Sequence, residues 1–422
     1  MEAEPQAIVP TARCGPMMVE PEVVSRPLKL QIFEHVRALG PVSRAEVAKR
    51  LSISPATVST LTAELIESGV LREEAVTRDP GDVVRGRPPV GLAVRPEAFI
   101  VAGIKLSDRE RTGILVDFAG RQLAAIRIAV DPGGVAPEAQ IDSLVQMVDG
   151  MLAEIGKTRV DLSAVGVGIP GFVEHGTGRV HWSPVLDRRD IDFAALATAR
   201  LGLPVTVDND ANLVALAELW FGRGRDKPDF AVVTVEHGVG MGVVMNHRLV
   251  RGANGLGLEL GHTKVQLEGA LCRCGQRGCL EAYIADYALA REATAALNLG
   301  TRELPSIAEL VEQLHGEAQG GNAAAQSIFQ RAGRYLALGL ANVVNLIDPT
   351  LIILAGERMR YDYLRAEDLL ADMQAFVIRD PETLPPLRIH EWGDLLWAHG
   401  AAALALSMVT ETEIGAPREA VA

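Results

Sequence analysis

Cysteine and long apolar runs are both scarce in this chain of 422 residues. Only four cysteines occur, and three of them lie within positions 272–279, which is a poor framework for disulfides and is typical of metal binding. No uninterrupted apolar run of about 18 residues occurs, so the sequence predicts no membrane-spanning helix. The first ten residues, MEAEPQAIVP, lack the basic and apolar regions of a secretory signal. We therefore expect a cytoplasmic protein that does not contact membranes.

Positive charge is also in deficit, because 41 Lys and Arg against 54 Asp and Glu leave a net charge of −13. This argues against a protein that binds nucleic acid over its whole surface. Between Arg26 and Arg95, however, 11 Lys and Arg stand against eight Asp and Glu, a local balance of +3. A mildly basic head on an acidic body fits a molecule that contacts DNA at one end only.

The composition changes along the chain and divides it into four regions. Residues 1–25 contain four prolines and little periodicity, so we expect a disordered tail. Residues 26–84 have the pattern of a winged helix-turn-helix domain, and residues 85–95 have that of a basic linker. Residues 96–422 alternate apolar strand-like runs with helical segments, which predicts an α/β body. The length suits about two to three domains.

Three helices are expected in the head. Apolar residues recur at helical spacing over 28–39, and Gly40-Pro41 ends this first helix. Ser43 caps a short second helix, with Glu46 in the position that completes a capping box. Ser54-Pro55 opens the third helix, since proline is tolerated in a first turn.

Two short helices joined by a tight turn are typical of helix-turn-helix proteins, whose second helix of the pair enters the major groove of DNA. In the helix that Ser54 opens, apolar side chains face inward and small polar ones remain outside near the N-terminus. Such hydroxyl side chains reach phosphates and base edges without steric cost. The pattern alone also fits an ordinary helical bundle. The candidate DNA contacts are Ser54, Ala56, Thr57, Ser59 and Thr60.

An arginine-rich tetrapeptide, Arg85-Gly86-Arg87-Pro88, follows the predicted wing and resembles the core of an AT-hook. Two arginines that flank a glycine fit a narrow minor groove, where the negative potential attracts guanidinium groups. Alone, the tetrapeptide is also compatible with a plain basic linker. Behind a helix-turn-helix, we expect Arg85 and Arg87 to extend the DNA footprint.

The body repeats one order of elements. The runs FIVAGIKL, TGILVDF and QLAAIRIAV predict three strands, and a helix around 137–156 and the buried strand AVGVGIP follow them. A similar order begins again at FAVVTVE and GVGMGVVM, which predicts two related α/β lobes. Residues 282–346 are expected to be mainly helical, followed by the buried strand LIILAG and a closing helix.

A histidine and three cysteines have the spacing of a metal site, H-x9-C-x-C-x4-C. Three thiolates and an imidazole complete a tetrahedral Zn²⁺ site with no open position, which predicts a structural zinc loop over 262–279. Gly275 and Gly278 allow that loop to curl between ligands. Buried free cysteines are the alternative. The candidate ligands are His262, Cys272, Cys274 and Cys279, and Cys14 in the tail is not expected to join them.

Several motifs of the body resemble those of the ROK family (repressors, open reading frames and sugar kinases). The E-x-G-H motif ends at His262, CRCGQRGCLE ends at Glu281, DNDAN ends at Asn212, and an early glycine loop ends at Gly171. Together with the head, they are similar to the family's repressors of the xylose, N-acetylglucosamine and glucose type. The resemblance implies an actin/hexokinase-like fold of two lobes, with a sugar held in the cleft between them.

The family's sugar contacts, carried to matching positions, are Asn209, Asp210, Glu259, His262, Glu281 and Gly171. Carboxylates and an amide pair well with vicinal hydroxyls in a dry cleft. His262 would bind zinc through one ring nitrogen and a sugar hydroxyl through the other. A solvated loop charge is the alternative for each carboxylate. One family stretch, S-P-N-L, reads Ser183-Pro184-Val185-Leu186 here, which leaves the identity of the sugar open.

The family's two phosphate loops are altered in this chain. Where the kinases carry D-x-G-G-T, the sequence reads KLSDR from Lys105, so a lysine replaces the carboxylate that helps to hold Mg²⁺. The second loop, G-T-G-x-G-G-G in the kinases, reads EHGVGMG from Glu236, whose charge would repel phosphates. Asp210 is the general base of the family's kinases, so its presence keeps an enzyme possible. We expect a protein without catalytic activity.

These observations predict a sugar-responsive, DNA-binding transcription regulator of carbohydrate genes, most simply a repressor. Its partners would be operator DNA and a monosaccharide or sugar derivative, its cofactor a structural Zn²⁺, and its assembly a homodimer or homotetramer. A sugar kinase with a regulatory DNA-binding head is the first alternative. A body that binds another protein instead of a sugar is the second. Induction and co-repression both stay open.

Replacement of Arg87 by alanine tests the predicted minor-groove contact. Arg87→Ala should weaken operator binding and reduce its dependence on salt concentration. The variant lacks one guanidinium group, so binding releases fewer counterions from the DNA phosphates. Fluorescence anisotropy titrations of an operator duplex at several salt concentrations measure both effects. An affinity equal to that of the unaltered protein at every salt concentration would refute the role of Arg87.

Overall fold

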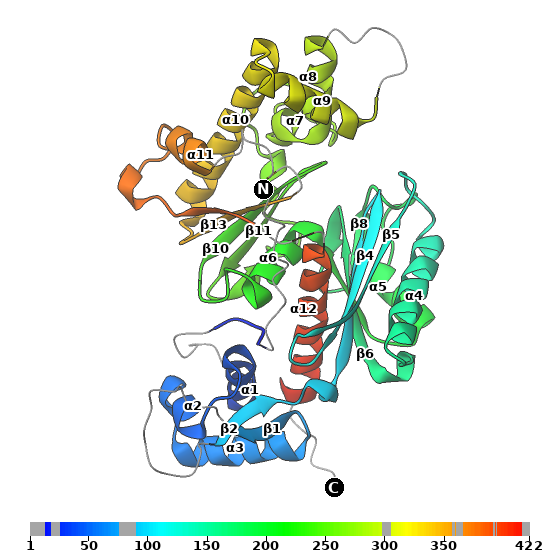
Figure 1. Cartoon of the computed structure of the whole chain (residues 1–422), viewed down its shortest axis with the longest axis vertical. Helices are drawn as coiled ribbons and strands as arrows, with labels where there is room; N and C mark the ends of the chain where they lie inside the picture. The colour runs from blue at the N-terminus through cyan, green and yellow to red at the C-terminus, as the bar shows by residue number, and fades with distance from the viewer. Residues whose placement is uncertain are drawn as a thin grey trace. The chain divides into compact units, whose positions relative to one another are not determined.

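The computed structural model of the chain describes residues 13–17, 26–75, 90–297, 305–356, 359, 366–390, 393 and 395–415 (Figure 1). The chain divides into two compact units, each with more contacts inside than outside. The first unit comprises residues 1–228 with 392–422, and the second comprises residues 229–391. Among the described helices, none is both long and apolar enough to cross a membrane.

The head contains the three expected helices, α1 (Leu28–Leu39), α2 (Arg44–Arg50) and α3 (Pro55–Glu67). The Ser43 hydroxyl accepts a hydrogen bond from the backbone N–H of Glu46, as predicted. The reciprocal half of the capping box is missing, because the Glu46 carboxylate instead accepts from Arg50 at 2.7 Å. The cap prediction is therefore confirmed only in part.

A two-stranded sheet closes the head. Strand β1 (Leu71–Ala75) pairs antiparallel with β2 (Val90–Val94), and Leu71 lies opposite Val94. Residues 90–94 differ from the basic linker expected over 85–95, since their backbone pairs with β1 and four of the five residues are buried. The tetrapeptide with Arg85 and Arg87 lies outside the described residues.

The first unit has a five-stranded sheet in the order β5-β4-β3-β6-β9. Antiparallel pairing joins the first three strands of that order, and parallel pairing joins β3 to β6 and β6 to β9. A small hairpin of β7 and β8 stands beside this sheet. The elements are β3 (Ile100–Leu106), β4 (Glu110–Asp117), β5 (Gln122–Ala129), α4 (Pro137–Glu154), β6 (Leu162–Ile169), β7 (Phe172–Glu174), β8 (Arg179–Trp182), α5 (Phe193–Leu201), β9 (Val205–Asn209), α6 (Asp210–Phe221) and α12 (Leu396–Thr410).

The second unit repeats this arrangement, in the order β12-β11-β10-β13-β14. Again two antiparallel pairings are followed by two parallel ones, which confirms the two related lobes expected from the sequence. Helices cover this sheet (Figure 1). The elements are β10 (Phe230–Val235), β11 (Val239–Met245), β12 (Arg248–Val250), α7 (Glu281–Ile284), α8 (Asp286–Ala296), α9 (Ile307–Gln319), α10 (Ala323–Ile347), β13 (Ile352–Ala355), α11 (Ala366–Met373) and β14 (Leu387–Ile389).

Helix α12 lies against the first sheet at an unusually short separation, which glycines permit. A Cβ atom on Gly103 of β3 would overlap the carbonyl oxygen of Ala398, and one on Gly166 of β6 would overlap that of Ala401. On the other side of the helix, a Cβ on Gly400 would overlap the carbonyl oxygen of Leu213 in α6. Backbone therefore contacts backbone on both sides of α12, and these elements are held in one register.

The substitution Gly166→Ala tests this packing. The added methyl group has no space beneath α12, so we expect the unfolding free energy to fall by about 2–3 kcal/mol. Gly150→Ala in α4 is the matched control, because its Cβ would make only an ordinary contact and alanine favours a helix, for a gain of about 0.5–1 kcal/mol. Urea denaturation followed by circular dichroism measures both changes. Equal stability of the two variants would contradict the close packing.

Candidate functional site

Two of the predicted sugar contacts of the first unit are joined by a hydrogen bond. Asn209 ends β9 and caps α6, where its side-chain oxygen accepts from the backbone N–H of Ala211 at 2.8 Å. Its amide nitrogen donates to the carbonyl of Gly171 at 2.7 Å. Gly171 has φ +118, and a Cβ there would overlap the carbonyl oxygen of Trp182. The glycine is therefore required for the close approach of this loop to the end of β8, while its carbonyl accepts from Asn209.

Asp210 follows Asn209 as the first residue of α6 and is half-buried. Burial raises the pKa of its carboxyl group, and the positive charge of Lys105 opposes that rise. The ammonium group of Lys105 lies 3.6 Å from the ring centroid of Trp397, a cation–π contact that fixes its position. Lys105 therefore favours the ionised form of this carboxyl group, whereas burial favours the neutral form.

Asp208 supports this segment, although the sequence analysis assigns it no role. Its carboxylate is buried and accepts hydrogen bonds from the side chain of Asn212 at 2.9 Å and the backbone N–H of Asn209 at 2.8 Å. His175 lies 3.3 Å from its other oxygen. A buried carboxylate requires such partners, and here they fix the turn from β9 into α6.

The four candidate metal ligands come together in the second unit. Their ligand atoms all lie within 4.8 Å of one another. The Cys274 and Cys279 sulfurs are 3.7 Å apart, and His262 Nδ1 lies 3.7 Å from the Cys272 sulfur. Zn–S bonds of about 2.3 Å in a tetrahedron separate two sulfurs by about 3.8 Å, so these residues fit zinc. The cluster is suited to a metal such as zinc.

The loop that carries these ligands curls as the glycines allow. Gly275 has φ +87 and Gly278 has φ +78, both in the left-handed region. Lys264 extends its ammonium group to the Cys279 sulfur at 3.1 Å and to the His262 carbonyl at 2.9 Å. A cation beside the thiolates reduces the net negative charge that a Cys₃His zinc site carries. The sequence analysis did not identify Lys264, which no motif marks.

Glu281 lies beside the metal cluster and is buried. One carboxylate oxygen is 3.5 Å from the Cys272 sulfur and 3.3 Å from the Tyr287 hydroxyl, which donates to it. The other oxygen accepts from the backbone N–H of Val239 at 3.3 Å, at the start of β11. Glu281 therefore links the zinc loop to the turn between β10 and β11.

Glu259 directly precedes the 3-10 turn Leu260–His262, and its side chain is exposed. The six predicted sugar contacts thus form two sets in two units. Gly171, Asn209 and Asp210 belong to the first unit, and Glu259, His262 and Glu281 belong to the second. Within the second set, His262 and Glu281 are brought together by their common contact with Cys272.

The candidate DNA contacts lie at the start of α3. Ser54 caps the helix, and its hydroxyl bonds to both the backbone N–H and the hydroxyl of Thr57. Ser59 is exposed and donates to the Pro55 carbonyl at 2.9 Å. Ala56 and Thr60 are also exposed. All five predicted residues therefore belong to one helix end, although three of their hydroxyls already have bonding partners in the helix.

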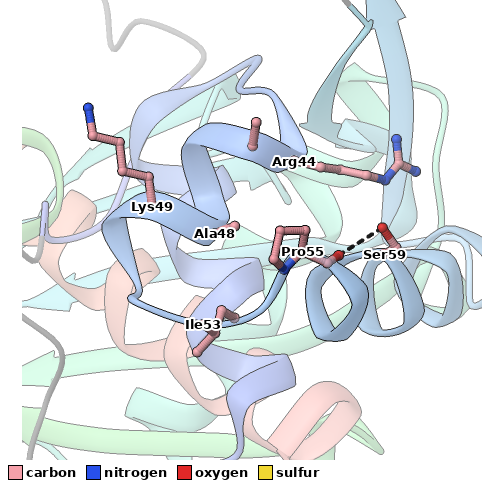
Figure 2. A pocket seen from close by; sticks show the side chains of 7 residues that line it. Arg44, Ala48, Lys49, Ile53, Pro55 and Ser59 are labelled. Carbon is pink, nitrogen blue, oxygen red and sulfur yellow. Dashed lines mark hydrogen bonds between the residues drawn. The ribbon is translucent and has the colours of Figure 1, made fainter.

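A hollow of about 410 Å³ separates α2 from the start of α3 (Figure 2). Among the residues that line it are Arg44, Lys49 and Ser59. Arg44 donates to the Thr62 hydroxyl at 3.0 Å and pairs with Glu73 of β1 at 2.8 Å. Lys49 is exposed, and Figure 2 shows its ammonium end directed away from the hollow. The Arg44 charge is thus paired with Glu73, whereas the exposed ammonium group of Lys49 suits a phosphate contact. No sequence motif marks either residue.

A model of the ROK family matches residues 101–408, which is most of the chain. The xylose repressor of Caldicellulosiruptor bescii is 28% identical over 351 residues, which cover 81% of this chain and 86% of the relative. The DNA-binding transcriptional dual regulator NagC of Escherichia coli (strain K12) is 27% identical over 329 residues, which cover 77% and 79%.

Solved structures extend the likeness to both parts of the chain. A ROK family transcriptional regulator, described as a homologue of the E. coli MLC protein, superimposes with a TM-score of 0.76 over 92% of this chain and 96% of its own, at 23% identity. The ROK hexokinase of Thermus thermophilus has a TM-score of 0.63 and 29% identity over 74% of this chain and 100% of its own. The similarity to the transcriptional regulator covers nearly the whole chain, head and body together. The similarity to the hexokinase covers a share of the chain that corresponds to the body alone.

Replacement of a candidate ligand tests the metal cluster. Cys274→Ser should lower the zinc content from one ion per chain to a small fraction, because the hydroxyl is a much weaker zinc ligand than a thiolate. Cys14→Ala is the matched control, since Cys14 belongs to the first unit and is not one of the clustered ligands. Mass spectrometry of the metal content of both purified variants measures the difference. Equal zinc in the two variants, or none in the unaltered protein, would contradict the assignment.

Proposed function

The chain belongs to the ROK family, and we propose that it is a sugar-responsive, DNA-binding transcription regulator without catalytic activity. The observation that carries the proposal is the combination, in one chain, of a capped helix-turn-helix head and a two-lobed ROK body. The similar proteins that cover 77% and 81% of the chain are a transcriptional regulator and a repressor. Repression of carbohydrate genes is the corresponding role for this protein.

Operator DNA is the proposed partner of the head. The exposed N-terminus of α3 supports this, because partial positive charge at a helix start and small hydroxyl side chains suit a phosphate backbone and base edges. Lys49, which is exposed at the end of α2, adds a positive charge to the head. Because half-sites lie about 34–36 Å apart or at multiples of that spacing, a homodimer or homotetramer would engage two of them.

A monosaccharide or sugar derivative is the proposed effector of the body. Support comes from Asn209, whose orientation is held by Gly171, and from Glu281, which has donors on both oxygens. A structural Zn²⁺ held by the four-residue cluster would fix His262 through Nδ1, which leaves Nε2 as the ring nitrogen for a sugar hydroxyl. The zinc would supply rigidity to the loop and no chemistry.

The chemistry near the former phosphate loops argues against phosphoryl transfer. Lys105 stands where the family's kinases have a carboxylate for Mg²⁺, and its ammonium lies over Trp397 beside Asp210. In the second loop, the backbone N–H of Val239 is already bonded to Glu281, so it is not free for a phosphate oxygen. These two features support a sensor over a kinase.

The second candidate function is a sugar kinase with a regulatory head. The retained Asp210 favours it, together with the 28% identity and TM-score of 0.61 to a ROK family glucokinase from Streptomyces griseus, solved with glucose and AMPPNP. An assay for sugar phosphate formed from a monosaccharide and Mg·ATP decides between the two. Clear turnover would overturn the sensor proposal.

The substitution Asp210→Asn tests the sugar site. It removes a charged hydrogen-bond acceptor worth about 1.5–3 kcal/mol, so sugar affinity should fall about 10- to 100-fold while DNA binding is retained. Thermal-shift screening with monosaccharides, followed by calorimetry of each sugar that raises the melting temperature, measures the affinity.

The matched control is Asp142→Asn on α4, whose carboxylate forms an exposed ion pair with Arg200. It should bind sugar as the unaltered protein does, because an exposed pair contributes little to stability. Tight binding of Mg·ATP with no response to any monosaccharide would contradict the proposed sensor. Binding of a protein partner in place of a sugar would then be the next reading to test.

A further inference from the structure

A short segment near the N-terminus, Arg13–Met17, docks between the head and the body of the first unit, and we name it the strap. The backbone N–H of Gly15 donates to the Trp220 carbonyl at 2.8 Å, and that of Met17 donates to the Arg225 carbonyl at 2.7 Å. The strap therefore differs from the disordered tail expected for residues 1–25. Its Cys14 is completely buried, with its sulfur 2.6 Å from where a Cβ of Gly120 would lie.

Arg225 ties the strap to the head. Its Nε donates to the Gly15 carbonyl at 3.1 Å, and another guanidinium nitrogen donates to the Ala38 carbonyl at 2.6 Å. Ala38 belongs to α1 of the head, whereas Arg225 follows α6 of the body. One side chain thus spans strap, head and body, and all of these contacts lie within a single unit.

Arg37 of α1 lies beneath the strap and is only 2% exposed. Its guanidinium donates to the Thr410 hydroxyl at 2.7 Å and lies 4.3 Å from the ring centroid of Trp220. Thr410 is the last residue of α12, and Trp220 is the next-to-last residue of α6. The head is therefore fastened to the ends of two body helices by one buried cation.

This cation is incompletely compensated. Among the described residues, Arg37 forms no salt bridge, and its Nε has no hydrogen-bond partner. Burial lowers the pKa of the guanidinium, which indicates that the charge is held at a cost. A buried charge with few partners is costly to hold, so the docked arrangement depends on Trp220 and Thr410 keeping their places beside the guanidinium.

Helix α6 connects this contact to the candidate sugar site. It has 12 residues, about 18 Å of helix, with Asn209 and Asp210 at its start and Trp220 at its end. Gly400 allows the backbone of α12 to contact that of α6, and the rings of Phe221 and His399 meet at 5.5 Å. In Figure 1, α12 runs alongside α6 and ends at the head. The two helices are therefore packed against each other backbone to backbone, which links their positions.

We infer that Arg37 is the positioning residue that couples the head to the sugar site. An occupant that shifts the start of α6 displaces Trp220 and Thr410 together, and the guanidinium between them transmits that displacement to α1. The strap holds the cation in place in the docked state and leaves it in the released state. The coupling rests on the proposed sugar sensing, whereas the docking of Arg37 does not.

Cys14 provides a native reporter of docking. It belongs to the strap and is completely buried against the body, and burial raises the pKa of its thiol to about 11, so the reactive thiolate is rare and shielded. Release of the strap exposes the thiol to iodoacetamide. Peptide mass spectrometry of the zinc-loaded full chain measures the alkylation rate of Cys14 separately from that of the cysteines in the metal cluster.

The first arm of the experiment compares variants. Arg37→Ala should accelerate alkylation of Cys14 at least ten-fold, and Arg72→Ala, which removes an exposed arginine of the same head, should leave the rate unchanged. Thr410→Val keeps the shape of the residue and replaces only the hydroxyl, so it should accelerate the alkylation of Cys14 less than Arg37→Ala does. This variant also tests the docking if Arg37→Ala does not fold. A rate in both docking variants equal to that of the unaltered protein would overturn the inference.

The second arm adds D-xylose, D-glucose or N-acetyl-D-glucosamine at millimolar concentration. A sugar that raises the melting temperature should change the Cys14 rate at least three-fold in the unaltered protein and leave it unchanged in Arg37→Ala. A melting shift without a change in rate would overturn the coupling and leave the proposed function intact. If no sugar raises the melting temperature, the proposed sugar sensing is wrong, and the coupling that rests on it is wrong as well. The docking of Arg37 is then tested by the first arm alone.

Discussion

The approach of α12 to the first sheet is the constraint on which the other features of the first unit depend. Gly103 and Gly166 bring the helix backbone against two adjacent strands, and Gly400 brings it against α6. Because backbone atoms cannot change rotamer, a shift of α6 has to carry α12 with it. In the docked state this contact sets the start of α6 beside β6, and with it Asn209 beside Gly171. It also sets where the last residue of α12 meets the head.

Local signals allowed much of this fold to be predicted from the sequence. The boundaries of α1 and α3 follow from Gly40-Pro41 and Ser54-Pro55, whose effects act within one or two residues of themselves. The metal cluster was equally predictable, because three of its four ligands fall within one short loop and the loop brings its own glycines. The two-lobed body followed from the repeated order of strands, which the two sheets confirm.

Contacts between distant positions could not be predicted in this way. Arg37 and its partner Thr410 are 373 positions apart, and nothing in the helical spacing of α1 distinguishes a buried arginine from a solvated one. The docking of the strap could not be predicted for a related reason. A short tail with four prolines has the composition of a disordered segment, and the surface that the strap contacts is formed by distant residues. Lys264 is a third case, because its role depends on the contact of its ammonium group with the Cys279 sulfur, and no sequence motif marks it.

The metal cluster and the Arg37 contact differ in how easily they can be broken, and this difference is relevant to function. A metal with four protein ligands would hold its loop permanently, because exchange requires several strong bonds to break. The guanidinium of Arg37 is held by one hydroxyl and two aromatic faces, and among the described residues no carboxylate forms a salt bridge with it. A regulator needs a rigid site for its effector and a contact near balance between effector and reader. The zinc loop suits the first requirement, and Arg37 suits the second. An apolar side chain would pack more stably between α1 and the ends of α6 and α12, but it would not give a contact that is easily released. The need for such a contact explains the costly buried charge at this position.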